Sequence, residues 1–323
     1  MRKWLDRYYG VFRKIKLNYV LLNLLNYGKL KANRNKYREL GLKKPVWAPV
    51  SSLDFGNRPD DRPWLDQPDA LHQLQNHPDF HTFDEGTRKE LLQWPERGYM
   101  VLDSFFTEAD VDAINAEVDR LITQKEVDFN FTGRKIMFAF RHSNLLREVA
   151  KDQRLHRLLS FVLGREVVPF QTINFLQGSE QRAHSDFIHM TTEPKGNLIA
   201  AWIALEDIHT DNGPLVYYPG SHKLPYILNG TYDHGGNRWM IGDDAYGRYE
   251  DEVQRMIDLH GLKPQEFHAK KGDVLVWHGN LYHAGKPILK EGATRKSMVV
   301  HFFGEGVFCY HELTQRPAFI ETV

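Results

Sequence analysis

Several features that define other classes of protein are scarce or missing in this chain of 323 residues. It has one cysteine, Cys309, so no disulfide can form within the chain, and a lone thiol suits a reducing compartment such as the cytoplasm. Its 42 lysines and arginines are balanced by 42 acidic residues, which leaves no overall charge to attract nucleic acid. It also lacks internal repeats and low-complexity tracts. With 41 % apolar residues, the chain can form one large core or two modest ones.

Positive charge is nevertheless concentrated at the N-terminal end. Residues 1–45 contain 13 lysines and arginines against two acids, Asp6 and Glu39, so this segment carries +11 and the remainder −11. Its apolar stretch, residues 17–27, is shorter than the roughly 20 residues that span a bilayer, and asparagines interrupt it, which argues against a signal peptide. Two interpretations stay open. A basic amphipathic helical extension could lie on the anionic inner face of a membrane, or a helix could pack against the protein body or a second copy.

Prolines mark the segment that follows the basic extension. Five of them lie between positions 45 and 68, and each disfavours helical geometry in the residue before it. We therefore predict that residues 46–84 form an extended, proline-rich connector laid over the surface.

The main domain is expected to cover residues 85–323 and to open with helices around a first strand. Thr107 and Asp110 have the spacing of a capping box, which predicts the start of a helix. Gly164 is placed to end a later helix. In order, we expect a helix over 87–94, a strand over 97–103, a helix from 107, one long helix over 145–163 and a strand over 167–176.

His184 and Asp186 are the first half of a candidate metal site. In a strand, side chains two residues apart face the same side, so an imidazole nitrogen and a carboxylate oxygen could reach one ion. One further imidazole would complete two histidines and a carboxylate on one triangular face, a set that suits non-haem iron(II) and leaves positions for a co-substrate and dioxygen. The pair alone is a weak signal, because 16 histidines and 42 acids make chance matches common. His283 is our candidate for the third ligand, and His278 competes with it.

The segments around this pair give it specificity. After the HSD string of residues 184–186 come WIALED at 202–207, NGPLVYYPGSHK at 212–223, GDVLVWHGNLYHAG at 272–285 and RKSMVVHF at 295–302. In this order and spacing, the strings resemble the phytanoyl-CoA dioxygenase family of iron(II)- and 2-oxoglutarate-dependent oxygenases, over about residues 96–303. The resemblance implies a mainly β fold with flanking helices, built on a double-stranded β-helix (jelly-roll, cupin-like) barrel.

The same resemblance assigns the metal ligands. His184, Asp186 and His283 match the iron(II) ligands, and the pattern selects His283 over His278. Asp186 is retained where related halogenases have a small residue, so the resemblance implies hydroxylation of an unactivated C–H bond, with succinate and CO2 as co-products. Desaturation and epimerisation stay open. One departure from the family pattern is Gly285, where a serine is often found.

Further residues are expected to hold 2-oxoglutarate. Arg295 matches the arginine that binds its distal carboxylate, and the planar guanidinium fork suits that group on physical grounds alone. Ser297 lies two residues on and could add a hydroxyl donor. Trp202 matches a tryptophan that lines the co-substrate pocket. Lys135 could reach the mouth of the site, or it could belong to a surface hairpin. Asn174 could face inward to hold the near carboxylate, although an outward or structural role is an open alternative.

A rim insertion, residues 224–262, interrupts the barrel pattern with a polar, aromatic loop and a helix. Loops on a rigid scaffold carry specificity, and an aromatic and polar set suits a sugar. We predict that the substrate is a small-molecule, lipid-linked or saccharide compound. Alternatives are a non-catalytic cupin-like binding protein and a metal-dependent cupin enzyme of other chemistry. The oligomeric state is left open. The candidate substrate contacts in the insertion are Tyr232, His234, Arg238, Trp239 and Tyr246.

Overall fold

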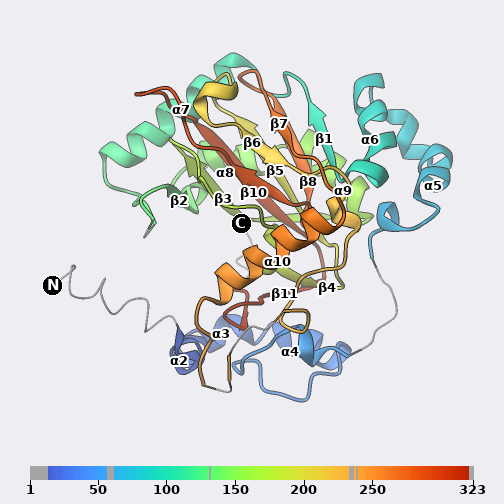
Figure 1. Ribbon diagram of the computed structural model, residues 1–323, viewed down its shortest axis with the longest axis vertical. Coiled ribbons are helices and arrows are strands. Elements are labelled where there is room, and N and C mark those ends of the chain that lie inside the picture. The colour runs from blue at the N-terminus through green and yellow to red at the C-terminus, as the bar shows by residue number, and fades with distance from the viewer. Residues whose placement is uncertain (1–13, 57–61, 131, 233–235, 238, 320–323) are drawn as a thin grey trace.

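The computed structural model describes residues 14–56, 62–130, 132–232, 236–237 and 239–319, and its centre is a pair of facing β-sheets (Figure 1). The larger sheet is antiparallel, with six strands in the order β1-β8-β5-β10-β3-β2. A three-stranded sheet, β7-β6-β9, faces it, and a second three-stranded sheet is ordered β12-β11-β4. The strands are β1 (Tyr99–Leu102), β2 (Lys135–Met137), β3 (Val167–Phe175), β4 (Thr191–Glu193), β5 (Leu198–Ala204), β6 (Leu215–Tyr217), β7 (Gln265–Phe267), β8 (Val274–His278), β9 (His283–Gly285), β10 (Ser297–Gly304), β11 (Phe308–His311) and β12 (Arg316–Pro317).

The central strand β5 shows how the two layers are joined, because its side chains alternate between two cores. Ala200, Trp202 and Ala204 face the small sheet, where they share a cluster with Leu215 and Phe267. The intervening residues of β5 face the helices on the other side of the large sheet. Both faces are buried, which explains the uninterrupted apolar run in the sequence. The predicted mainly β fold with flanking helices is confirmed, and its sheets are antiparallel.

Helices α6 to α9 cover the outer face of the large sheet (Figure 1). The predicted capping box at the start of α7 is confirmed: the Asp110 N–H donates to Thr107 Oγ1 over 3.1 Å, and the Thr107 N–H donates to Asp110 Oδ2 over 3.0 Å. The prediction of one long helix over 145–163 was wrong. Asp152 accepts from the Leu155 N–H over 3.2 Å and starts a new helix, which ends at the predicted Gly164. The bounds are α6 (Glu85–Arg97), α7 (Glu108–Thr123), α8 (Asn144–Ala150) and α9 (Gln153–Leu163).

The proline-rich connector is not extended. It contains the helix α5 (Ala70–Asn76) and 3-10 turns at Ser52–Asp54, Trp64–Asp66 and Pro78–Thr82. Pro63 and Pro78 stand at the start of turns, where a missing N–H costs nothing, so prolines begin helical turns here instead of preventing them. Side chains of this segment, including Leu65, Leu74 and Phe80, are buried in the main core.

The N-terminal residues that the structure describes form three short helices, α2 (Lys16–Leu25), α3 (Tyr27–Leu30) and α4 (Asn33–Glu39). They lie beside β4 and β11, at the opposite end of the molecule from α7 (Figure 1). Tyr37 packs edge-on against Phe308 with ring centroids 5.3 Å apart, and Leu30 shares their apolar cluster. Within the described ranges, every helix is too short or too polar to cross a membrane.

A buried carboxylate fastens this N-terminal segment to the body. Glu312, fully buried after β11, accepts from the Ser52 N–H over 2.9 Å, the Ser52 hydroxyl over 2.5 Å and the Asn229 N–H over 2.9 Å. Burial raises the Glu312 pKa, and these hydrogen bonds partly oppose that shift. One side chain therefore joins the connector, the C-terminal strands and the rim insertion.

Replacing Ser52 with alanine should lower the free energy of unfolding by about 1–3 kcal/mol, because it removes a hydrogen bond to a buried carboxyl group. Urea denaturation would measure the loss. The neighbouring Leu53→Ala is the control, since Leu53 is 68 % exposed. If the two variants were equally stable, the Glu312 contacts would not be a stabilising connection.

Candidate metal centre

His184 and His283 come from segments about a hundred residues apart that pair through their backbones. The His184 N–H donates to the His283 carbonyl over 3.0 Å, and the His283 N–H donates to the His184 carbonyl over 2.9 Å. The expected regular strand through His184 and Asp186 was wrong, because Asp186 starts a 3-10 turn, Asp186–Ile188. Ser185 between them is extended, with φ −106° and ψ 148°, so both side chains still point to one side. His283 opens β9 and does not belong to β8, which ends at His278.

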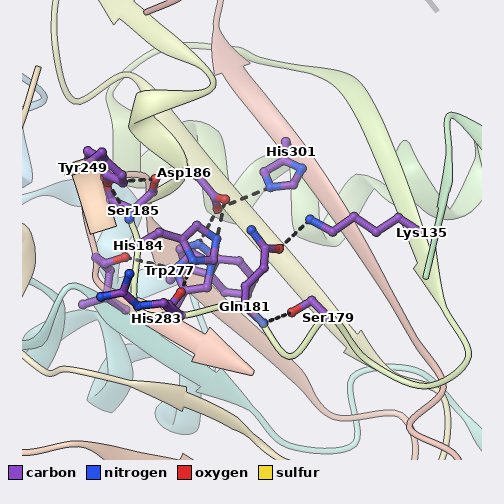
Figure 2. A network of polar contacts seen from close by, with 12 residues as sticks. Lys135, Ser179, Gln181, His184, Ser185, Asp186, Tyr249, Trp277, His283 and His301 are labelled. Carbon is purple, nitrogen blue, oxygen red and sulfur yellow. Dashed lines mark hydrogen bonds and ion pairs between the residues drawn. The ribbon is translucent and has the colours of Figure 1, made fainter. Parts of the chain in front are cut away.

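The three predicted ligands converge. One ligand atom from each of His184, Asp186 and His283 lies within 4.8 Å of the others, and all three side chains are buried (Figure 2). The His283 Nε2 atom is 3.8 Å from Asp186 Oδ1, and the two imidazole centroids are 4.4 Å apart. Two imidazoles and one carboxylate at this spacing can bind one divalent ion on a single face.

Backbone carbonyls orient both imidazoles. His184 Nδ1 lies 2.8 Å from the Arg182 carbonyl, and His283 Nδ1 lies 3.1 Å from the Leu281 carbonyl. A carbonyl only accepts, so each Nδ1 carries the proton and each Nε2 presents a lone pair to the ion. In both cases the carbonyl belongs to the residue two positions earlier.

Asp186 is ionised, and one of its two carboxylate oxygens is hydrogen-bonded to neighbouring side chains. The Trp277 indole N–H donates to Asp186 Oδ2 over 2.9 Å, and His301 Nε2 lies 3.3 Å from the same oxygen (Figure 2). Burial by itself would raise the Asp186 pKa, but the imidazoles of His283, His301 and His184 hold that pKa well below its usual range. Oδ1 remains directed at His283 and the ion position.

His184 is correspondingly neutral. Burial and the neighbouring His283 lower the His184 pKa well below the ordinary value, and Asp186 opposes this only in part. A neutral imidazole beside an ionised carboxylate is the protonation state that a metal ion requires of its ligands.

Arg295 is a buried cation that pairs directly with no carboxylate of the described residues, and the charge of Glu206 only partly opposes the effect of burial on its pKa. Its side chain is 2 % exposed, its Nε has no hydrogen-bond partner, and no carboxylate of the described residues forms an ion pair with it. Burial lowers the Arg295 pKa to about 10, so the guanidinium is still charged at neutral pH. Its central carbon lies 5.6 Å from the Phe175 ring centroid and 5.9 Å from that of Trp202. A buried, incompletely bonded guanidinium between two rings is suited to a carboxylate ligand.

Ser297 and Gly178 complete the surroundings of Arg295. Ser297 is fully buried and its hydroxyl has no partner, as expected for a second donor on the same strand face. Gly178 adopts φ +71°, and a Cβ there would lie 2.5 Å from Arg295 Nε. Only glycine leaves room for the guanidinium at this turn, a role that sequence analysis missed.

Lys135 reaches the centre, whereas Asn174 does not. Lys135 on β2 donates to the Gln181 side chain (Figure 2), and burial lowers its pKa, with Asp186 opposing the shift. Asn174 pairs with Ile136 and Met298, which both face the helices, while its neighbours on β3 face the small sheet. The inward orientation expected for Asn174 was therefore wrong, because alternation along β3 turns it away from Arg295.

The rim insertion contributes one of its predicted residues to the site. Tyr246 on α10 (Ala245–Leu259) accepts from Gln181 Nε2 over 3.2 Å, and its ring lies 5.1 Å from that of His189. Tyr232 packs behind α10 against Tyr249, and Trp239 is 62 % exposed, so neither is brought to the metal ligands. His234 and Arg238 lie outside the described residues.

The sequence analysis missed several residues that surround the ligands. Trp277 and His301 lie within the quoted motifs, but neither was assigned a role. His301 could have been found by alternation, because Arg295, Ser297 and His301 share one face of β10 and its approach. His189, whose pKa burial lowers to about 3, lies with its ring 6.4 Å from that of His184. His311, whose ring lies 5.3 Å from that of His189, comes from β11 and gave no signal in the sequence.

Comparison with known proteins agrees with this geometry. An ectoine dioxygenase of Halomonas elongata is 28 % identical over 211 residues, covering 60 % of this chain and 63 % of the relative. The peroxisomal phytanoyl-CoA dioxygenase of Bos taurus is 23 % identical over 236 residues, covering 65 % and 66 %. The chain thus spans slightly less than two-thirds of the length of these two relatives.

Solved structures share the fold. EctD from S. alaskensis with bound Fe superposes with a TM-score of 0.54 at 20 % identity, covering 69 % of this chain and 79 % of that one. The α-ketoglutarate-dependent carbocyclase SnoK from nogalamycin biosynthesis gives 0.57 at 16 %, covering 74 % and 89 %. The sequence model of the family "Phytanoyl-CoA dioxygenase (PhyH)" matches residues 94–297, well over half of the chain. The chain therefore belongs to the phytanoyl-CoA dioxygenase family.

Proposed function

We propose that the protein is an iron(II)- and 2-oxoglutarate-dependent dioxygenase that hydroxylates an unactivated C–H bond. The observation that supports this most strongly is the convergence of His184, Asp186 and His283, together with the buried guanidinium of Arg295, whose Nε has no hydrogen-bond partner among the described residues. In the reaction, 2-oxoglutarate loses CO2 and becomes succinate. One atom of dioxygen enters the succinate carboxylate and the other becomes the hydroxyl of the product.

The donor set fits both the metal and the co-substrate. Two neutral imidazoles and one carboxylate oxygen would hold iron(II), which when bound supplies the activation of dioxygen that organic side chains cannot. Arg295 would pair with the distal carboxylate of 2-oxoglutarate, the Ser297 hydroxyl would donate to it, and Trp202 would form the adjacent wall. Burial of all these groups excludes water from the reacting atoms.

For the substrate we propose a small-molecule, lipid-linked or saccharide compound that approaches past α10. The polar and aromatic groups near the ligands support this choice, since Gln181, His189 and Tyr246 offer hydrogen bonds and ring faces. We place the protein in the cytoplasm, with the N-terminal residues against the inner membrane face.

Metal-dependent binding of 2-oxoglutarate tests the activity directly. Under anaerobic conditions, calorimetry should show one 2-oxoglutarate per chain with Mn(II), a redox-stable substitute for iron(II), and much weaker binding without metal. With iron(II) and dioxygen, mass spectrometry should detect succinate. Asp186→Ala should lose both signals, because it removes the only anionic ligand. Absence of metal-dependent binding in the unmodified protein would contradict the proposal.

Arg295 variants test the carboxylate pocket. Arg295→Gln should weaken 2-oxoglutarate binding about tenfold or more, since it removes a buried, charge-assisted interaction. Arg295→Lys should restore little, because an ammonium cannot reproduce the planar fork. Mn(II) affinity, measured separately, should stay unchanged. Equal 2-oxoglutarate affinity in all three proteins would show that the co-substrate binds elsewhere.

The two tryptophans of the site should have separable effects. Trp277→Phe removes the donor to Asp186 Oδ2 and should lower Mn(II) affinity about tenfold, as expected for loss of a hydrogen bond that orients a ligand. Trp202→Phe should leave metal affinity intact and weaken 2-oxoglutarate binding by roughly threefold to tenfold, through its contact with Arg295. Each variant is the control for the other. If both lost metal and co-substrate alike, the assigned roles would be wrong.

A further inference from the structure

Helix α2 exposes its apolar side chains to solvent. Leu17 is 50 % exposed, Leu21 51 %, Leu24 45 % and Leu25 85 %. Their spacing of four, three and one places them along one face of the helix. A surface helix of a globular protein normally buries such a face. These four leucines, with the exposed Leu22 on an adjacent side of the helix, form an apolar patch that is unusual for a protein surface.

The polar side of the same helix faces the protein. Asn23 is 1 % exposed and its side-chain amide donates to the Trp47 carbonyl over 3.0 Å. Lys16 is 7 % exposed and its Nζ donates to the Asn237 carbonyl over 2.7 Å. Specific hydrogen bonds therefore fix the rotation of α2, and this rotation directs the leucines outward.

The rim insertion meets the first turn of α2 through backbone contacts. The Lys16 N–H donates to the Trp239 carbonyl over 2.8 Å, and Ile15 forms a bridge with Met240. Trp239, 62 % exposed, therefore stands at the first turn of α2. We call Leu17, Leu21, Leu24, Leu25 and Trp239 the leucine–tryptophan face. Tryptophan next to aliphatic side chains is typical of surfaces that enter the headgroup region of a bilayer.

Positive charge follows α2 in the chain. Between residues 26 and 45 the exposed charged side chains are basic except for Glu39, which pairs with Lys36 over 2.6 Å. Their cations would meet lipid phosphates when the leucines are inserted, and each basic residue near an anionic surface contributes about 1 kcal/mol. The exposed basic residues are Lys29, Lys31, Arg34, Arg38 and Lys43.

We propose that the leucine–tryptophan face docks on an anionic lipid surface, with α2 lying in the plane of the headgroups. Ten residues of helix span about 15 Å, too little to cross a bilayer but enough to lie on one. The insertion that carries Trp239 leads into α10, whose Tyr246 contacts Gln181 beside the metal ligands. Docking would thus place lipid close to the entrance of the site. The proposal does not depend on the enzymatic activity.

Flotation of the full chain with vesicles provides the test. The protein should float with vesicles of phosphatidylcholine and phosphatidylglycerol and much less with phosphatidylcholine alone. A double variant, Leu21→Gln with Leu25→Gln, should reduce the bound fraction about tenfold or more. The matched control is Leu259→Gln with Leu289→Gln, because these leucines are 65 % and 68 % exposed elsewhere. Circular dichroism and metal-dependent 2-oxoglutarate binding should be unchanged in both double variants.

The charge contribution is tested in the same way. Lys31→Glu with Arg38→Glu should weaken binding to anionic vesicles at least about tenfold, and the loss should shrink as salt is raised. Lys263→Glu with Lys290→Glu makes the same change of net charge at exposed lysines outside this segment and should have little effect. Quenching of tryptophan fluorescence by brominated lipid should fall in Trp239→Ala.

Three results would overturn the proposal. The first is an equal bound fraction for the leucine variant and its control. The second is equal binding to neutral and anionic vesicles. The third is concentration-dependent dimerisation in sedimentation that the leucine variant abolishes, without vesicle binding, which would make this face a contact between two copies of the chain.

Discussion

The reciprocal pair of backbone hydrogen bonds between His184 and His283 is the constraint on which the rest of the site depends. It joins two segments that are distant in sequence, and it fixes both imidazoles at one separation before any ion is bound. Asp186 follows through one extended residue, so the carboxylate inherits its position from the same pair. Hydrogen bonds to the carbonyls of Arg182 and Leu281 orient the two imidazoles, and the hydrogen bond from Trp277 orients the Asp186 carboxylate.

The protein buries a carboxylate, Asp186, and a guanidinium, Arg295, that do not pair with each other. Bound ligands could neutralise both charges. At one point, the Asp186 carboxylate lies among the imidazoles of the candidate ligands, which hold its pKa well below the usual range. At another, the buried Arg295 guanidinium stays cationic without a direct ion pair to a described carboxylate. A buried charge is costly unless it is paired, and a dicarboxylic keto acid together with a divalent ion would satisfy both ends.

The N-terminal segment connects the site to the outer surface of the molecule. Glu312 and the cluster around Tyr37 fasten it to β11, and the backbone contacts of Lys16 fasten it to the rim insertion. The rim insertion carries both Trp239 and α10, and Tyr246 on α10 contacts Gln181 near the metal ligands. This one insertion therefore connects the leucine–tryptophan face to the surroundings of the ligands. Recognition of a surface and access to the centre can therefore be linked through one element.

The sequence by itself predicted the three ligands and the family, because the quoted motifs, in their order and spacing, resemble the phytanoyl-CoA dioxygenase family. It also predicted Arg295 and Ser297 as one face of β10. Only the tertiary structure decided that Asn174 points away, that Trp277 and His301 support Asp186, and that the proline-rich segment joins the core. These outcomes depend on which distant chains meet. These contacts depend on which strands pair and on which side chains the complete fold buries. A local sequence pattern specifies neither.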